Sequence, residues 1–157
     1  MCNFKSAIVV RDETLKGGFK LLMSPWTESH SDLIKIFKLR DDGRLRFARV
    51  EFVPESMDKA YLPETYTLKI DEGRRPEWFD DEMQEKVAAK LRTYIKSIIV
   101  DGSVELLIGG QFIIAPGARV ECCHEMVIHA ICGGTGSAIW GGTVSANRGG
   151  TVSAVRG

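Results

Sequence analysis

The sequence lacks most of the features that would assign a function at once. Its formal net charge is zero, so a broad electrostatic attraction to nucleic acid or to an anionic membrane is not expected. No apolar run reaches the roughly 18 residues that a membrane-spanning helix needs. No charged segment followed by an apolar one opens the chain, as it would in a secretory signal. The composition therefore predicts a cytoplasmic protein, with its four cysteines reduced and with no nucleic-acid or membrane partner.

Charged residues are scarce in the last third of the chain, and glycine is scarce before it. Residues 1–100 hold 35 of the 42 charged side chains, and lysine does not occur after Lys96. Glycine is distributed in the opposite way, with 12 of its 16 residues after position 100. This change in composition predicts two domains, a small α+β capping domain at 1–100 and a different fold at 101–157.

The first region has the pattern of β-β-α-β-β-α, and a mostly antiparallel sheet is expected. Two short apolar runs, SAIVV at 6–10 and FKLLM at 19–23, are separated by polar residues and a Gly-Gly pair, which predicts a hairpin. Ser29 and Asp32 have the spacing of a capping box at the start of a short helix. RFARVEFV at 46–53 and YTLKI at 66–70 alternate in polarity, which is typical of half-buried strands.

The clearest helix of the first region follows Pro76. A proline is well tolerated near a helix start, where its missing N–H has no partner to lose. Asp80, Asp81 and Glu82 fall in the predicted first turn, where their charge suits the helix dipole. Apolar residues then recur at spacings of three and four as far as Ile98, which predicts one buried face.

The second region repeats with a period of eight residues. From Asp101 the octads are DGSVELLI, GGQFIIAP, GARVECCH, EMVIHAIC, GGTGSAIW, GGTVSANR and GGTVSAVR. The fourth and sixth positions are apolar in every octad except at Gly136, and the first position is often glycine. Since neighbouring side chains of a strand point to opposite faces, each octad predicts one strand with an apolar inner face and a glycine corner.

Repeats this short favour a β-solenoid, in which each coil covers the one before it. An interior of Val and Ala is thin, so two octads per coil are favoured. Three octads per coil and a plain meander of hairpins are the alternatives. Residues 101–157 resemble octapeptide-type β-solenoid repeat proteins. The opening MCNFKSAIVV and the run HSDLI, followed by such a tail, are similar to uncharacterised proteins of phage and bacterial genomes, and this similarity covers residues 1–100. These resemblances imply a shape but no activity and no cofactor.

Two groups of residues suggest chemistry as alternatives. Removal of Met1 would leave Cys2 as an N-terminal nucleophile for amide or ester chemistry, with His30 and Asp32 as its nearest helpers. A zinc site could be sought in CCHEMVIHAIC, at Cys122, Cys123, His124, His129 and Cys132. The octad register argues against zinc, because it places these residues on different faces and at opposite edges of a two-sided coil.

The favoured function is therefore non-enzymatic, a binding or assembly module without a cofactor. The last full octad has an apolar pair and little charge to guard its edge, so it can act as a template for another chain. A homo-oligomer, formed as an isologous dimer, or an unidentified protein partner is expected there. The predicted interface consists of Thr151, Val152, Ser153, Ala154, Val155 and Arg156.

Overall fold

The computed structural model describes residues 5–42, 45–70, 75–131, 135–138, 143–147 and 151–154. Its contacts divide the chain into two compact units. The first unit consists of Met1–Val53 and Tyr66–Arg92, and the second of Pro54–Thr65 and Thr93–Gly157. Each unit is built from two separate stretches of sequence. The domain boundary expected near residue 100 stays a prediction.

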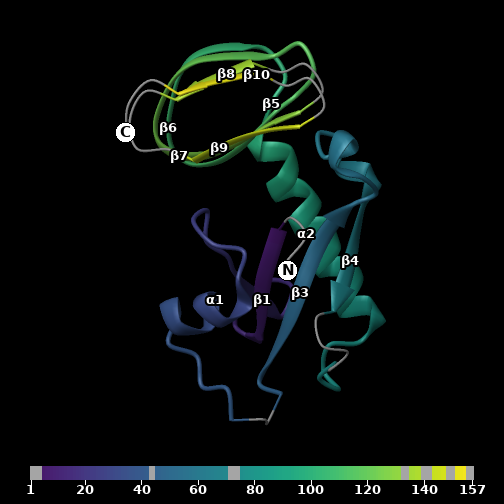
Figure 1. Cartoon of the computed structure of the whole chain (residues 1–157). Coiled ribbons are helices and arrows are strands. Elements are labelled where there is room, and N and C mark those ends of the chain that lie inside the picture. The colour runs from purple at the N-terminus through teal and green to yellow at the C-terminus, as the bar shows by residue number, and fades with distance from the viewer. Residues whose placement is uncertain are drawn as a thin grey trace. The chain divides into compact units, whose positions relative to one another are not determined.

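The first unit contains a four-stranded antiparallel sheet and, with its two helices, has the predicted α+β fold (Figure 1). The strands are ordered β2-β1-β3-β4. The expected hairpin is confirmed, because β1 pairs with β2 antiparallel, with Ile8 opposite Leu22. The strand bounds are β1 Lys5–Arg11, β2 Phe19–Leu22, β3 Phe47–Pro54 and β4 Tyr66–Ile70.

Both predicted helices form, and each begins at a side-chain cap. Helix α1 spans His30–Ile36, and the Ser29 hydroxyl accepts a hydrogen bond from the Asp32 amide at 3.3 Å, as the capping-box spacing predicts. Helix α2 spans Asp81–Ile98. Asp80 is not in its first turn but caps it, since its carboxylate accepts from the Met83 amide at 2.8 Å. Among the described residues, no helix is both long and apolar enough to cross a membrane.

The core of the first unit lies on both faces of the sheet. Ile8, Leu22, Leu33 and Phe47 form a buried cluster between the sheet and α1. Elsewhere Phe52 of β3 stacks on Tyr66 of β4, with ring centroids 5.1 Å apart. Burial raises the pKa of the Tyr66 hydroxyl, so this ring stays neutral over the physiological range.

The second unit is built from parallel strands. Their order is β10-β8-β7-β6-β5, and β9 pairs with β7 outside that path. Every strand pair described in this unit is parallel, which a meander of hairpins would not produce. The strand bounds are β5 Ile99–Val100, β6 Ser103–Ile114, β7 Arg119–Ile131, β8 Thr135–Ala138, β9 Thr143–Asn147 and β10 Thr151–Ala154.

The long strands β6 and β7 are bent, so their two halves have different neighbours. Arg119 and Val120 in the first half of β7 pair with β8, whereas Val127–Ile131 in its second half pair with β9. Figure 1 shows β8 and β10 together on one side of the curved strands and β9 on the other. In β6 the chain bends at Gly110, whose φ of 110° is open to glycine but strained for other residues.

Burial in the second unit follows the octad register in some octads only. Ser103 and Arg119, at third positions, are exposed, and Val120, at a fourth position, is buried. In the second octad, however, the outer positions are buried as well, at Gln111, Ile113 and Ala115. One other part of the same unit covers this octad, since Tyr61 packs against the cluster that contains Ala115. The outer positions therefore face solvent only where nothing covers the strand.

The segment 54–65, which contains Tyr61, forms two short 3-10 turns at Met57–Lys59 and Pro63–Thr65. The Glu55 amide donates to the Thr65 carbonyl at 3.1 Å, which closes the segment on itself. Tyr61 packs against a buried apolar cluster formed by Val100, Ile114, Ala115, Ala118 and Val120.

Candidate functional site

The C-terminal unit offers the most extended candidate site, the edge of strand β10. In the strand order β10 is the terminal member, and β8 is its neighbour on one side. Within the described residues no strand pairs with its other side. The edge strand of a sheet presents unpaired N–H and C=O groups, to which a further strand can add.

The predicted interface residues lie partly on this edge strand. Thr151 is exposed, and Val152, Ser153 and Ala154 follow it in β10, paired with Gly136, Ser137 and Ala138 of β8. Val155 and Arg156 lie outside the described residues. The interface expected from the sequence therefore coincides with a sheet edge over four residues.

Third-position residues of alternate octads form one column across the strands. Ser103 pairs with Arg119, Arg119 with Thr135, and Thr135 with Thr151. Ser103, Arg119 and Thr151 are exposed, and Thr135 is half-buried. Arg119 is the charged residue of this column, and the two members nearest β10 are threonines. The column is therefore polar but uncharged near β10.

The residues of the zinc alternative are spread along β7. Cys122, Cys123 and His124 lie in its first half, opposite Leu106–Ile108 of β6. His129 lies in the second half, opposite Ser145 of β9, and Cys132 lies outside the described residues. The side chains of these five residues are not among those that the structure describes. Among the side chains that it does describe, no group of three His, Cys, Asp or Glu residues could hold a metal ion.

The residues of the enzyme alternative lie in different surroundings. Cys2 lies outside the described residues. His30 is buried, and its Nε2 lies 3.0 Å from the Val50 carbonyl oxygen, which can only accept a hydrogen bond, so Nε2 carries the proton. Asp32 is exposed and forms an ion pair with Lys35 at 3.6 Å. His30 thus contributes to the packing of α1, and Asp32 lies at its surface.

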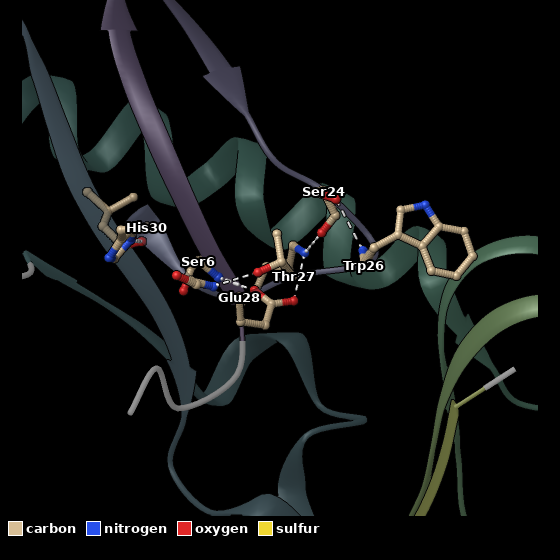
Figure 2. A network of polar contacts seen from close by, with 9 residues as sticks. Ser6, Ser24, Trp26, Thr27, Glu28 and His30 are labelled. Atoms are coloured by element: carbon tan, nitrogen blue, oxygen red, sulfur yellow. Dashed lines mark hydrogen bonds and ion pairs between the residues drawn. The ribbon is translucent and has the colours of Figure 1, made fainter. Parts of the chain in front are cut away.

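A buried polar network in the N-terminal unit has no counterpart in the sequence predictions (Figure 2). Lys5, at the start of β1, is fully buried. Its ammonium donates to the Ser24 carbonyl at 2.8 Å and to Glu28 Oε1 at 2.9 Å. The other oxygen of Glu28 accepts from the Ser6 amide at 2.6 Å. Glu28 therefore neutralises a buried cation and also serves as a hydrogen-bond partner for the backbone of β1.

The loop between β2 and α1 is held in place by this network. The Trp26 amide donates to the Ser24 hydroxyl, and the Ser29 amide donates to the Thr27 hydroxyl. Figure 2 shows the Trp26 ring directed away from the network, and this residue is 57% exposed. The network thus fixes the backbone of a loop that carries an exposed aromatic side chain.

Two arginines of the stretch RDDGRLRFAR at 40–49 are paired with acids. Arg46 bonds to Asp42 at 3.2 Å, and Arg49 forms an ion pair with Asp41. Cations that are neutralised in this way do not form a free basic patch for phosphates. Comparison with protein-family models, with curated proteins and with solved structures finds no match to this chain.

Proposed function

We propose that this protein is a non-enzymatic binding or assembly module, built as a short β-solenoid with two octads per coil. The turns at 54–65 would cover its first coil, and the strand edge at β10 would bind a partner. The module needs no cofactor and no metal, and it works in the cytoplasm with its cysteines reduced.

The observation that carries the proposal is the offset between paired residues. Val104 pairs with Val120, Val127 with Thr143, and Thr135 with Thr151, so each residue meets the one 16 positions later. Sixteen residues are two octads, and each pair joins the same octad position. A two-sided coil produces this offset, because the strand that follows half a coil later lies on the other side.

A second observation supports a regular coil. The Arg119 amide donates to the Gly102 carbonyl at 3.1 Å, and the Thr135 amide donates to the Ala118 carbonyl at 2.9 Å. Both bonds run from a third octad position to a second position in the preceding coil. The same bond therefore recurs after 16 residues, at the same place in the repeat.

Association through β10 is tested by the mass of the full chain in solution. Light scattering should give an oligomer for the wild type and a monomer for Thr151→Lys, because a lysine on an edge strand opposes pairing with another strand. The control is Ser103→Lys, which is exposed like Thr151 and has the same octad position in β6, and it should leave the oligomer intact. A monomeric wild type, or a Thr151→Lys protein with an unchanged oligomer, would contradict the proposal.

A further inference from the structure

We propose that the partner at this edge is a second copy of the chain, which adds antiparallel to β10 about a two-fold axis at Ser153. This inference rests on the proposed function and gives it a defined geometry. In this arrangement Val152 of one copy is opposite Ala154 of the other, and the two Ser153 residues are opposite each other.

The backbone groups that point to the open side of β10 are identified by the preceding coils. The amides of Arg119 and Thr135, both at third positions, donate toward the preceding coil. In a strand the N–H and C=O of one residue point to the same side, and those of the next residue point to the other side. Applied to β10, this rule directs Thr151 and Ser153 toward β8 and leaves the groups of Val152 and Ala154 on the open edge.

The choice of register follows from two conditions. An antiparallel partner must place fourth and sixth octad positions opposite each other, because a shift by one residue would exchange the two faces of the strand. The axis must therefore pass through a residue rather than between residues. With the axis at Ser153, Val152 and Ala154 of the two copies exchange both of their hydrogen bonds, so every edge group of Thr151–Ala154 is satisfied.

The sequence of this edge favours a copy of the same chain as the occupant. Residues 133–156 contain no Lys, Pro, Asp or Glu, the residues that most often protect an edge strand. The paired neighbour of this edge, β8, lies in the octad GGTGSAIW, which resembles the octad GGTVSAVR of β10, so this edge already pairs with a strand of similar sequence. A two-fold contact also closes the assembly at a dimer, whereas head-to-tail stacking of coils would continue into a filament.

Cysteine cross-linking of the full chain tests this register. The two Ser153 residues form a non-hydrogen-bonded pair, whose Cα atoms are about 4.5 Å apart, within the range of a disulfide. Mild oxidation of Ser153→Cys should therefore convert most of the protein to a dimer linked between the two residues 153. The linkage is mapped by peptide mass spectrometry, and wild type under the same oxidant accounts for the native cysteines.

Two matched variants serve as controls. In Thr151→Cys, the new thiols lie four residues apart along the paired strands, about 13 Å. In Ser137→Cys, they lie one strand further in on each side, about 14 Å apart. Neither should form a symmetric cross-link above the wild-type background. A cross-link in a mixture of Thr151→Cys and Ser153→Cys chains, without the symmetric Ser153 link, would instead place the axis at Val152 and overturn the proposed register.

Proline substitution separates the open edge from the paired side of the same strand. Ala154→Pro removes an N–H that points to the open edge, where proline is tolerated, so circular dichroism should be unchanged while the dimer is lost. Ser153→Pro removes an N–H directed toward β8 and should disrupt the C-terminal strands. Two results would refute this inference but not the proposed function. One is a dimer that survives Ala154→Pro, and the other is a wild type that dimerises while Ser153→Cys forms no cross-link. A monomeric wild type refutes the proposed function as well.

Discussion

Replacing Glu28 by glutamine should test how strongly the buried network stabilises the N-terminal unit. The substitution keeps the size of the side chain but removes the negative charge beside Lys5, which is fully buried, while Glu28 itself is 24% exposed. Removing one member of a buried ion pair leaves the other charge without compensation and costs about 3–5 kcal/mol. Because water reaches part of Glu28, we expect Glu28→Gln to lower the free energy of unfolding by about 3 kcal/mol, the lower end of this range.

The reverse change should cost less. Lys5→Met removes the buried cation, and Glu28 keeps its hydrogen bond from the Ser6 amide and its access to water. We expect a loss of about 1–2 kcal/mol. The double variant should lose no more than the lysine variant does, since it contains no uncompensated charge. The two substitutions are therefore strongly non-additive, with a coupling of about 3 kcal/mol.

The assay is urea unfolding followed by tryptophan fluorescence. A Trp140→Phe background leaves Trp26 and Trp78, both in the N-terminal unit, so that the signal reports on this unit. The control is Glu82→Gln, which breaks an exposed ion pair with Lys86 on α2 and should cost less than about 0.5 kcal/mol. The reasoning fails if Glu28→Gln costs no more than this control, or if its effect adds to that of Lys5→Met.

Two further predictions concern the C-terminal unit. Gly110→Ala should destabilise this unit by about 1–3 kcal/mol in thermal melts, because an alanine is strained at φ 110°. The added Cβ would make only ordinary van der Waals contacts, so backbone strain is the whole cause. The control Gly102→Ala, where a Cβ meets nothing within 4 Å, should be neutral in the same melts. Val144→Asp, at an inner octad position, should cost several kcal/mol, whereas Thr143→Asp, at an outer one, should stay within about 0.5 kcal/mol. Equal melting shifts for these two aspartates would contradict the octad register.

The local signals in the sequence predicted the N-terminal elements well. Ser29 caps α1 as its spacing to Asp32 indicates, because a capping bond joins residues that are close in sequence. The predicted first turn of α2 included Asp80, which in the structure caps the helix from just outside it. Three acidic residues in a row, 80–82, do not show which of them is the cap. The order of the elements follows from alternation and helical periodicity, which depend only on nearby residues.

The candidate sites depended on contacts between distant residues, which the sequence does not display. In the sequence Lys5 is a charged residue at the start of a strand, and its burial involves partners 19 and 23 positions away, the Ser24 carbonyl and Glu28. The burial of Gln111 and Ile113 is likewise outside the octad pattern, which assigns their positions to the outer face. The pattern predicts two faces for each strand but not which faces another element covers.

The division of the chain has a consequence for synthesis on the ribosome. The polypeptide passes from one unit to the other after Val53, after Thr65 and after Arg92. The turns at 54–65 emerge early, but the strands against which Tyr61 packs follow about 40 residues or more later. Domains usually fold as units in the order of synthesis, whereas here the early segment must wait for the later strands. The two units therefore cannot be exchanged as separate gene segments, and a cut at residue 100 would separate Tyr61 from Ile114, Ala115, Ala118 and Val120 of its cluster.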